Sequence, residues 1–198
     1  MILTAKRIPD WVAANSRILD LGCGDGRLLA ELIESHGITG LGLELDPEKI
    51  AICLDRGLSV VQQDLNRGLS NFRDQQFDTV LMTQTLQAIR RPDLLLDEML
   101  RVGREAIVTF PNFAHLKNRL QLGLGGHMPV NPQLPNPWYD TPNIHLSTFD
   151  DFEALCRTLG IRILDRDTAN LSGQSTWLGR VWPNLFGEVA IYRLTKES

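Results

Sequence analysis

Glycines that alternate with other residues, just after a carboxylate, are the part of this sequence with the clearest chemical meaning. Gly22, Gly24 and Gly26 follow a short apolar run that ends in Asp20-Leu21, and a helical pattern begins directly after them. Alternate glycines let the backbone turn sharply and bring main-chain N–H groups close to a ligand. The spacing departs from the dinucleotide fingerprint G-x-G-x-x-G, because Arg27 stands where the last glycine would be.

The carboxylate before the loop narrows the choice of ligand. Asp20 would repel a pyrophosphate and attract a cation. S-adenosylmethionine carries an ammonium, a sulfonium and a nucleoside but no phosphate, so the loop suits this ligand better than NAD. A glycine-rich turn that serves only chain reversal is the alternative, although the glycines exceed what a turn needs. Cys23, inside the loop, is interpreted as a compact filler rather than as a nucleophile.

Two more carboxylates follow the next expected strands. Glu44 comes about 20 residues after Gly22, where a carboxylate can accept both ribose hydroxyls of a nucleoside. Asp46 is the alternative ribose ligand, but its place before Pro47 favours a helix start. Asp64 follows the third strand, where it is either part of the same ligand site or a solvated loop aspartate. Gln84, after the fourth strand, is either a hydrogen-bond partner of the ligand or a helix-start residue.

These residues need a scaffold that brings strand ends together. Apolar runs alternate with amphipathic ones, which predicts a parallel sheet with helices on both faces. We expect strands at 17–21, 39–45, 58–62, 77–83, 105–110, 162–167 and 188–195, and helices at 4–14, 26–36, after Asp46, after Pro92 and at 148–160. All of them fit one domain, residues 1–198.

The segment 111–147 interrupts this alternation with many prolines and glycines. Long segments of this kind in compact domains are usually functional lids or disordered, and its aromatic residues and histidines favour a lid. It holds the candidate general bases, which are His115, His127, Tyr139, Asp140 and His145; packing and hydrogen bonding within the lid are the alternative roles. The histidines and cysteines lack the spacing of a metal site, so no metal is expected.

Composition limits the function further. The chain has 198 residues, 43% hydrophobic and 22% charged, with a net charge of −4. This charge disfavours nucleic acid as the main partner. No apolar stretch approaches the length that spans a membrane, and no signal peptide is evident at Met1–Ala14. The few cysteines, odd in number, are typical of a cytoplasmic protein.

The glycine loop and the residues after it resemble motif I of the class I S-adenosylmethionine-dependent methyltransferases. The resemblance implies a doubly wound, mostly parallel, seven-stranded Rossmann-like α/β sheet with a C-terminal antiparallel hairpin. It also implies that Asp64 meets the adenine amino group and that Leu65 stacks on the ring. The cofactor-binding set is then Asp20, Gly22, Cys23, Gly24, Gly26, Glu44, Leu45, Asp64, Leu65 and Gln84. The Asn/Asp-Pro-Pro-Tyr motif of DNA-adenine and glutamine-amide methylation is missing after the fourth strand.

Nearly the whole chain is similar to the MetW family of methionine biosynthesis proteins. The distinctive carriers are Phe110-Pro111-Asn112-Phe113, Gly123-Leu124-Gly125-Gly126 and the run Pro135-Asn136-Pro137-Trp138-Tyr139-Asp140-Thr141-Pro142-Asn143-Ile144-His145. The resemblance implies a cytoplasmic protein of methionine metabolism that is associated with homoserine O-acyltransferase. It implies no particular methyl acceptor.

Two functions therefore remain. One is methyl transfer from S-adenosylmethionine to a small molecule, with S-adenosylhomocysteine as the product and His115, Tyr139 or His145 as the base. The other is a non-catalytic accessory partner of homoserine O-acyltransferase. For the latter, we expect the connection 172–186 to dock the partner, since Trp177, Arg180 and Trp182 are of the types that dominate interface hot spots; packing of both tryptophans onto the sheet edge is the alternative. An NAD-dependent oxidoreductase is disfavoured by Asp20.

Overall fold

A seven-stranded sheet forms the centre of the protein, in a computed structural model that describes residues 7–132, 134–170 and 176–196. The strands are β1 (Arg17–Leu21), β2 (Thr39–Glu44), β3 (Val60–Gln62), β4 (Phe77–Thr83), β5 (Gly103–Pro111), β6 (Ile161–Ala169) and β7 (Val189–Lys196). Their order is β3-β2-β1-β4-β5-β7-β6. The first five run parallel, and β7 is antiparallel to both β5 and β6. The expected α/β fold with a C-terminal antiparallel hairpin is confirmed.

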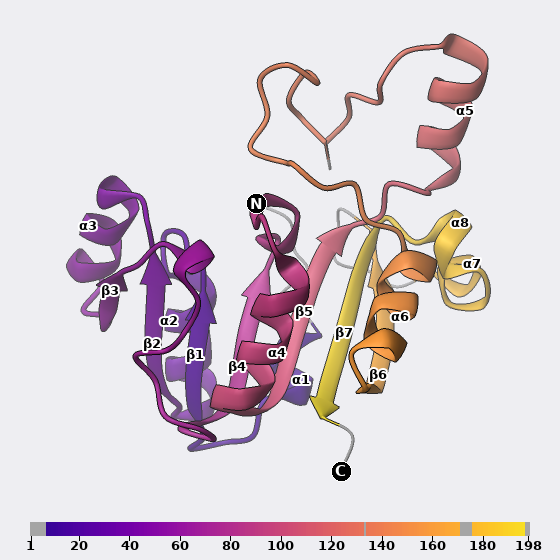
Figure 1. Ribbon diagram of the computed structural model, residues 1–198. Coiled ribbons are helices and arrows are strands. Elements are labelled where there is room, and N and C mark those ends of the chain that lie inside the picture. The colour runs from indigo at the N-terminus through magenta and orange to yellow at the C-terminus, as the bar shows by residue number, and fades with distance from the viewer. Residues whose placement is uncertain (1–6, 133, 171–175, 197–198) are drawn as a thin grey trace.

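Helices cover both faces of the sheet. They are α1 (Ile8–Trp11), α2 (Arg27–His36), α3 (Pro47–Asp55), α4 (Pro92–Val102), α5 (Leu116–Gly125), α6 (Phe149–Thr158), α7 (Trp177–Val181) and α8 (Pro183–Phe186), with short 3-10 turns η2 (Leu65–Arg67) and η3 (Leu86–Ala88). In Figure 1, α1 and α2 lie behind the sheet, while α4 and α6 lie in front of it. In the described part of the chain, no helix has the length and apolarity needed to cross a bilayer.

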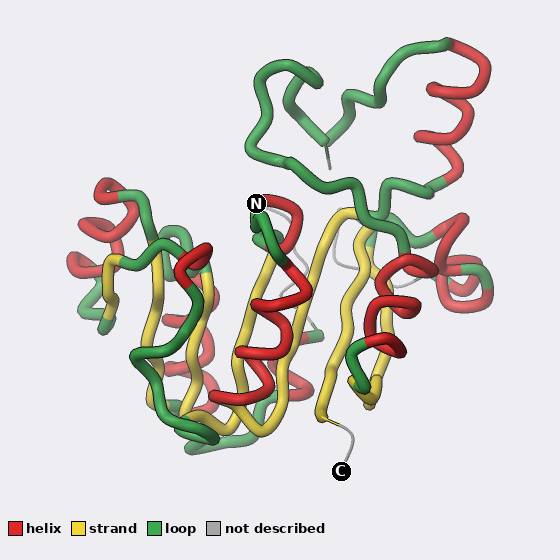
Figure 2. Tube along the Cα trace, in the orientation of Figure 1, coloured by secondary structure: helices red, strands yellow, loops and turns green. Residues whose placement is uncertain are grey.

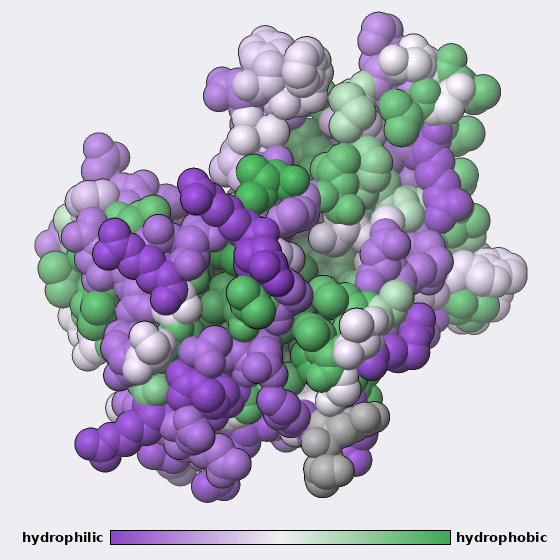
Figure 3. All heavy atoms as spheres, in the orientation of Figure 1, coloured by the Kyte–Doolittle hydropathy of each residue, from purple (hydrophilic) through white to green (hydrophobic). Residues whose placement is uncertain are grey.

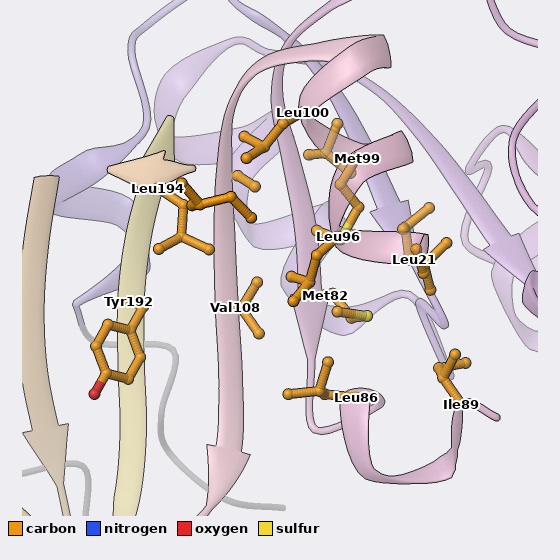
Figure 4. Close-up of a cluster of buried hydrophobic side chains, with 14 of the residues drawn as sticks. Leu21, Met82, Leu86, Ile89, Leu96, Met99, Leu100, Val108, Tyr192 and Leu194 are labelled. Carbon is orange, nitrogen blue, oxygen red and sulfur yellow. The ribbon is translucent and has the colours of Figure 1, made fainter. Parts of the chain in front are cut away.

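Successive residues of the central strands supply the two hydrophobic layers. On β4, Leu81 packs into the cluster under α1 and α2, whereas Val80 and Met82 pack into the larger cluster under α4 and α6. Figure 4 shows Leu96, Met99 and Leu100 of α4 directed toward strand residues of this larger cluster. The middle of β4, Val80-Leu81-Met82, is buried on both faces of the sheet and is therefore apolar at every position.

Helix starts follow the local sequence signals. The side chain of Asp46 accepts a hydrogen bond from the N–H of Glu48 at 3.0 Å and caps α3. The hydroxyl of Thr148 accepts from the N–H of Asp151 at 3.1 Å and caps α6. Each cap satisfies a backbone donor that the first turn of a helix leaves unpaired. The sequence interpretation of Asp46 as a helix start is therefore confirmed.

Two expectations about helices were wrong. The helix expected at 4–14 ends at Trp11, because Val12 is already extended (φ −96°, ψ 124°), and residues 4–6 lie outside the described part. The segment 111–147, expected without regular structure, contains α5. Its glycines and weak amphipathic pattern hid this helix, whose start is marked by the His115 side chain accepting from the N–H of Lys117.

The segment 111–147 projects beyond the sheet. Figure 2 shows it as a long loop plus α5, standing above the ends of the strands where the parallel strands finish. Its ends meet where the N–H of Phe113 donates to the carbonyl of Ser147 at 2.9 Å. It also contacts the body at η3, where the carbonyl of Gln87 accepts from the N–H groups of Ile144 (2.9 Å) and His145 (3.0 Å). The segment is therefore held over the strand ends.

Candidate functional site

The candidate site lies where the strand order reverses, between β1 and β4. In open α/β sheets, ligands bind at the carboxyl ends of the strands at this switch point. The loop after β1 turns at Gly22, which has φ +70°, and the N–H groups of Gly22 and Cys23 donate to the carbonyl of Leu43 at 2.8 and 3.0 Å. A Cβ on Gly22 would lie 2.6 Å from the hydroxyl of Thr85, which follows β4. Only glycine lets the two loops approach this closely.

The Glu44 carboxylate joins the glycine loop to the end of β2. One of its oxygens accepts from the N–H of Gly24 at 2.9 Å, and the other accepts from the N–H groups of Leu45 (2.8 Å) and Asp46 (3.0 Å). The side chain is only 9% exposed. Glu44 therefore positions the loop as well as facing the cavity described below, a structural role that its spacing in the sequence did not reveal.

Asp20 is a buried carboxylate beneath the same loop. The residue is 1% exposed, and its Oδ1 has no hydrogen-bond partner among the described residues. Burial, and to a lesser extent the nearby Glu44 carboxylate, raise the pKa of Asp20 to about 7. An unpaired buried oxygen is costly, and a cationic or hydrogen-donating ligand would relieve that cost.

A cavity of about 820 Å³ opens next to these residues. Its walls come from the glycine loop, the end of β2, the stretch from Thr83 to Ala88 and the projecting segment: Gly22, Gly24, Glu44, Leu45, Asp46, Pro47, Lys49, Thr83, Gln84, Thr85, Gln87, Ala88, Pro135, Asn136, Pro142 and Asn143. In Figure 3, green side chains gather in the hollow between the projecting segment and the body. The structure thus brings together one site from four separate stretches of sequence.

The fit of a nucleoside cofactor is supported by the shape of the loop side of this cavity. A Cβ added to Gly24 would meet nothing within 4 Å, so the backbone there faces open space. Leu45 is 56% exposed and presents an apolar surface to the cavity, as a stacked base requires. Glu44 stands beside it, and the unpaired Asp20 oxygen lies under the loop. These acceptors and the apolar surface suit S-adenosylmethionine.

Gln84 adopts a backbone conformation that a non-glycine residue rarely takes, with φ +54°. Its N–H donates to both the carbonyl (3.0 Å) and the hydroxyl (3.1 Å) of Thr109 on β5, which hold it there. Strained residues of this kind cluster at functional sites. Gln84 lines the cavity, and its expected hydrogen bond to a ligand stays a prediction.

Gln87 is a site residue that sequence reasoning missed. It is 8% exposed, its Nε2 donates to the carbonyl of Gln84 at 2.8 Å, and its Oε1 has no partner among the described residues. It lines the same cavity and holds the projecting segment through its backbone carbonyl. A glutamine in a polar stretch gives no sequence signal for burial, so only the structure reveals it.

The predicted adenine-binding pair lies outside this cavity. Asp64 caps η2, and its side chain accepts from the N–H (2.9 Å) and the Nδ2 (3.0 Å) of Asn66, which lowers the pKa of Asp64. Leu65 is 8% exposed and packs in the larger hydrophobic cluster. Leu65 also borders a separate cavity of about 540 Å³ between η2 and α4. Their roles toward adenine stay predictions.

The candidate general bases are dispersed over the projecting segment. His115 caps α5 and borders a separate cavity of about 120 Å³ with Asn112 and Glu188; burial lowers its pKa. His145 lies beside the carbonyl of Arg90, and Tyr139 is 74% exposed. His127 and Asp140 are exposed. None of these residues lines the large cavity, so the structure does not bring the predicted bases to the cofactor loop.

The cysteines and acidic residues offer little other chemistry. Cys23, Cys53 and Cys156 are free, and burial is the main cause that raises the pKa of each thiol. A raised pKa makes a thiol a poor nucleophile. Among the described residues, no group of three or more histidine, cysteine, aspartate or glutamate side chains is arranged to hold a metal ion.

Comparison with known proteins agrees with this architecture. The family model of methionine biosynthesis protein MetW matches residues 4–194. A bifunctional methionine biosynthesis protein MetXA/MetW from Rhodopirellula baltica is 40% identical over 167 residues, which cover 80% of this chain and 27% of that protein. A 2-ketoarginine methyltransferase from Streptomyces arginensis is 28% identical over 89% of this chain and 55% of its own length. The chain thus spans about half or less of these relatives.

Solved structures with the same fold include an S-adenosylmethionine-dependent methyltransferase from Thermotoga maritima. It superposes with a TM-score of 0.67 over 98% of this chain and 88% of its own, at 18% identity. From the family model, the relative at 40% identity and this architecture, we conclude that the chain belongs to the MetW family of methionine biosynthesis proteins and has the fold of the S-adenosylmethionine-dependent methyltransferases.

Proposed function

We propose that the protein binds S-adenosylmethionine in the large cavity and transfers its methyl group to a small molecule held under the segment 111–147. The observation that carries the proposal is the pairing of two buried carboxylates, Asp20 and Glu44, at the ends of adjacent strands beside an open glycine loop. Glu44 lines the cavity, whereas Asp20 is buried behind it, so a ligand with a ribose and a cationic end would contact the first and be attracted by the charge of the second. Membership of the MetW family assigns the activity to methionine metabolism, and the free cysteines suit the cytoplasm.

Each residue of the site has a separate task in this proposal. When bound, the cofactor would supply an electrophilic methyl group; the acceptor's lone pair would take the methyl, the sulfur would keep the electrons of the broken bond, and the acceptor's proton would pass to solvent. Asp20 balances positive charge near the loop, and Glu44 accepts from the ribose while it holds Gly24. Gln84 lies across the switch point from the glycine loop. The segment 111–147 acts as a lid that excludes water, which strengthens the electrostatic interactions beneath it.

A second candidate function is an accessory role toward homoserine O-acyltransferase. The Rhodopirellula baltica relative is named as one bifunctional MetXA/MetW chain, which is the observation that favours this role. Residues 172–175 of the expected docking connection lie outside the described part of the chain, and its described part, 176–186, offers a surface because Trp177 is 71% exposed and Trp182 is 56% exposed. Packing of both tryptophans onto the sheet edge is therefore not what the structure has. The carbonyls of Pro183, Asn184 and Gly187 all accept from Nδ2 of Asn112, at the base of the lid.

The first prediction concerns Glu44. Glu44→Gln places an amide N–H₂ where a carboxylate oxygen now accepts, so both the ribose and the loop lose an acceptor. We expect affinity for S-adenosylhomocysteine, measured by calorimetry, to fall by about 1–3 kcal/mol, or roughly 5- to 150-fold. Glu48→Gln, the same change on an exposed residue outside the cavity, is the control and should bind as wild type. Unchanged affinity in a folded Glu44→Gln protein would remove Glu44 from the site.

The second prediction concerns pH. Because the pKa of Asp20 is raised to about 7, the carboxyl is neutral at pH 5.5 and largely ionised at pH 7.5. The ammonium of S-adenosylhomocysteine stays charged over most of that range. Affinity of the wild type should therefore rise between pH 5.5 and 7.5, and the rise should be lost in Asp20→Asn. An identical pH profile for both proteins would contradict the assignment.

The raised pKa of Asp20 also predicts how the stability of the ligand-free protein depends on pH. A carboxyl whose pKa is higher in the folded than in the unfolded state stabilises the fold below the unfolded pKa, and this stabilisation is lost as pH rises through about 7. Asp20→Asn avoids the buried charge. Its free energy of unfolding, measured in urea, should exceed that of the wild type at pH 8, and the difference should shrink toward pH 4.

The third prediction concerns the lid. Trp138 and Tyr139 are 73% and 74% exposed, so chymotrypsin should cleave beside them in the free protein. Saturation with S-adenosylhomocysteine should slow this cleavage if the cofactor stabilises the closed segment. Cleavage beside Trp177, which is equally exposed but outside the segment, is the internal control. Equal rates with and without the cofactor at all three residues would show that the segment is not a lid.

The fourth prediction concerns the accessory role. Trp177→Ala/Arg180→Ala should lose co-purification with homoserine O-acyltransferase, because it removes the residue types that dominate interfaces. Trp138→Ala, which removes an exposed tryptophan from the lid instead, should retain the partner. The accessory role fails if the wild type never binds the acyltransferase. The docking surface alone fails if the folded double variant binds it with unchanged affinity.

A further inference from the structure

The large cavity has two halves of different chemistry. Its charged lining residues, Glu44, Asp46 and Lys49, all lie at or after the end of β2. The opposite half is made by the stretch from Thr83 to Ala88 and by Pro135, Asn136, Pro142 and Asn143, and none of these lining residues carries a charge. Since the charged half is assigned to the cofactor, the uncharged half is left for the acceptor.

One residue that lines the uncharged half, Gln87, has a strong acceptor atom that is buried and unpaired. Oε1 of Gln87 has no partner among the described residues, although the residue is 92% buried. The donation of its Nε2 to the carbonyl of Gln84 at 2.8 Å fixes which end of the amide is the oxygen. A buried carbonyl oxygen without a donor costs free energy. A ligand that donates an N–H or O–H at this point would remove the cost.

An apolar cavity adjoins this half. It measures about 180 Å³ and shares the lining residues Asn136 and Asn143 with the large cavity. Its remaining walls are Phe113, Met128, Pro129, Leu134, Trp138, Thr141, Ile144 and Leu146, none of them charged. The space suits a branched aliphatic group rather than a charged one.

We propose that the methyl acceptor is an uncharged small molecule with an N–H or O–H donor beside a short aliphatic group. The donor binds Oε1 of Gln87, and the aliphatic group enters the cavity between Phe113, Leu134 and Ile144. Free carboxylates, phosphates and ammonium groups are poor ligands there, because the lining residues provide no opposite charge. This inference rests on the proposed function and adds the substrate class to it.

The test uses three probes of matched shape and different charge. Isovaleramide, isovalerate and isopentylamine share the branched chain and differ in the polar group. Their affinities are measured by ligand-observed NMR at pH 7, with and without saturating S-adenosylhomocysteine. We expect the amide to bind at least about tenfold more tightly than either ion. Equal or tighter binding of isovalerate or isopentylamine to the wild type would overturn the proposal without any variant.

Two variants test whether the preference for the amide probe arises at Gln87. Gln87→Met keeps the length of the side chain but removes the acceptor, and it should abolish the preference for the amide. Gln121→Met, on an exposed position of α5, is the matched control and should behave as wild type. A preserved amide preference in folded Gln87→Met would contradict the assignment of the acceptor atom.

The failure of this inference is distinguishable from that of the proposed function. If S-adenosylhomocysteine binds and the amide shows no preference, the acceptor class is wrong and the cofactor site stands. If S-adenosylhomocysteine fails to bind while the amide is still preferred, the cofactor proposal is wrong and the subsite stands.

Discussion

The arrangement of the site depends on two acidic side chains that are buried, where the charged form of a carboxylate is disfavoured. Asp20 and Glu44 end neighbouring parallel strands on the same side of the sheet, and both are nearly fully buried. Glu44 is held by three backbone N–H groups, whereas an oxygen of Asp20 is left unpaired. The fold therefore satisfies one carboxylate with its own backbone and leaves an oxygen of the other without a partner among the described residues. The glycine loop is held by Glu44 in the absence of any ligand.

The two halves of the cavity are built from opposite sides of the switch point of the sheet. The loops after β1 and β2 form the charged half of the cavity, and η3 with the projecting segment forms the uncharged half. Gln87 belongs to both parts of the architecture, since its side chain faces the cavity and its carbonyl holds Ile144 and His145. A substitution of its side chain would therefore alter recognition of a ligand, whereas the backbone carbonyl that holds the segment would remain. Nearby Gln84, in the same half, is held in a strained backbone conformation by its hydrogen bonds to Thr109.

The sheet was predictable because its signals are local. Apolar runs such as 80–82, helix caps such as Asp46 and Thr148, and alternate glycines are signals that depend only on neighbouring residues. The remainder depends on contacts between distant residues. No local pattern shows that Glu44 accepts from Gly24, or that Gln87 is buried under the segment 111–147. The helix α5 was missed because its local signal is weak, since Gly123 and Gly125 lower the helix propensity of the segment. The dispersal of the histidines over that segment likewise follows from its path and not from their spacing.

The closed base of the projecting segment has a consequence for how this fold can diversify. The chain leaves the sheet domain at Phe113 and comes back to it at Ser147. The N–H of Phe113 donates to the carbonyl of Ser147 at 2.9 Å and joins the two ends of the segment. The residues between them add no strand to the sheet, because the pairing of β5 with β4 and β7 is complete without them. No residue of 114–146 takes part in the pairing of β5 or β7, so the register of these strands does not depend on the segment. Exchange of the segment would therefore change the cavity walls that Pro135, Asn136, Pro142 and Asn143 provide, on a sheet that keeps its strand pairing.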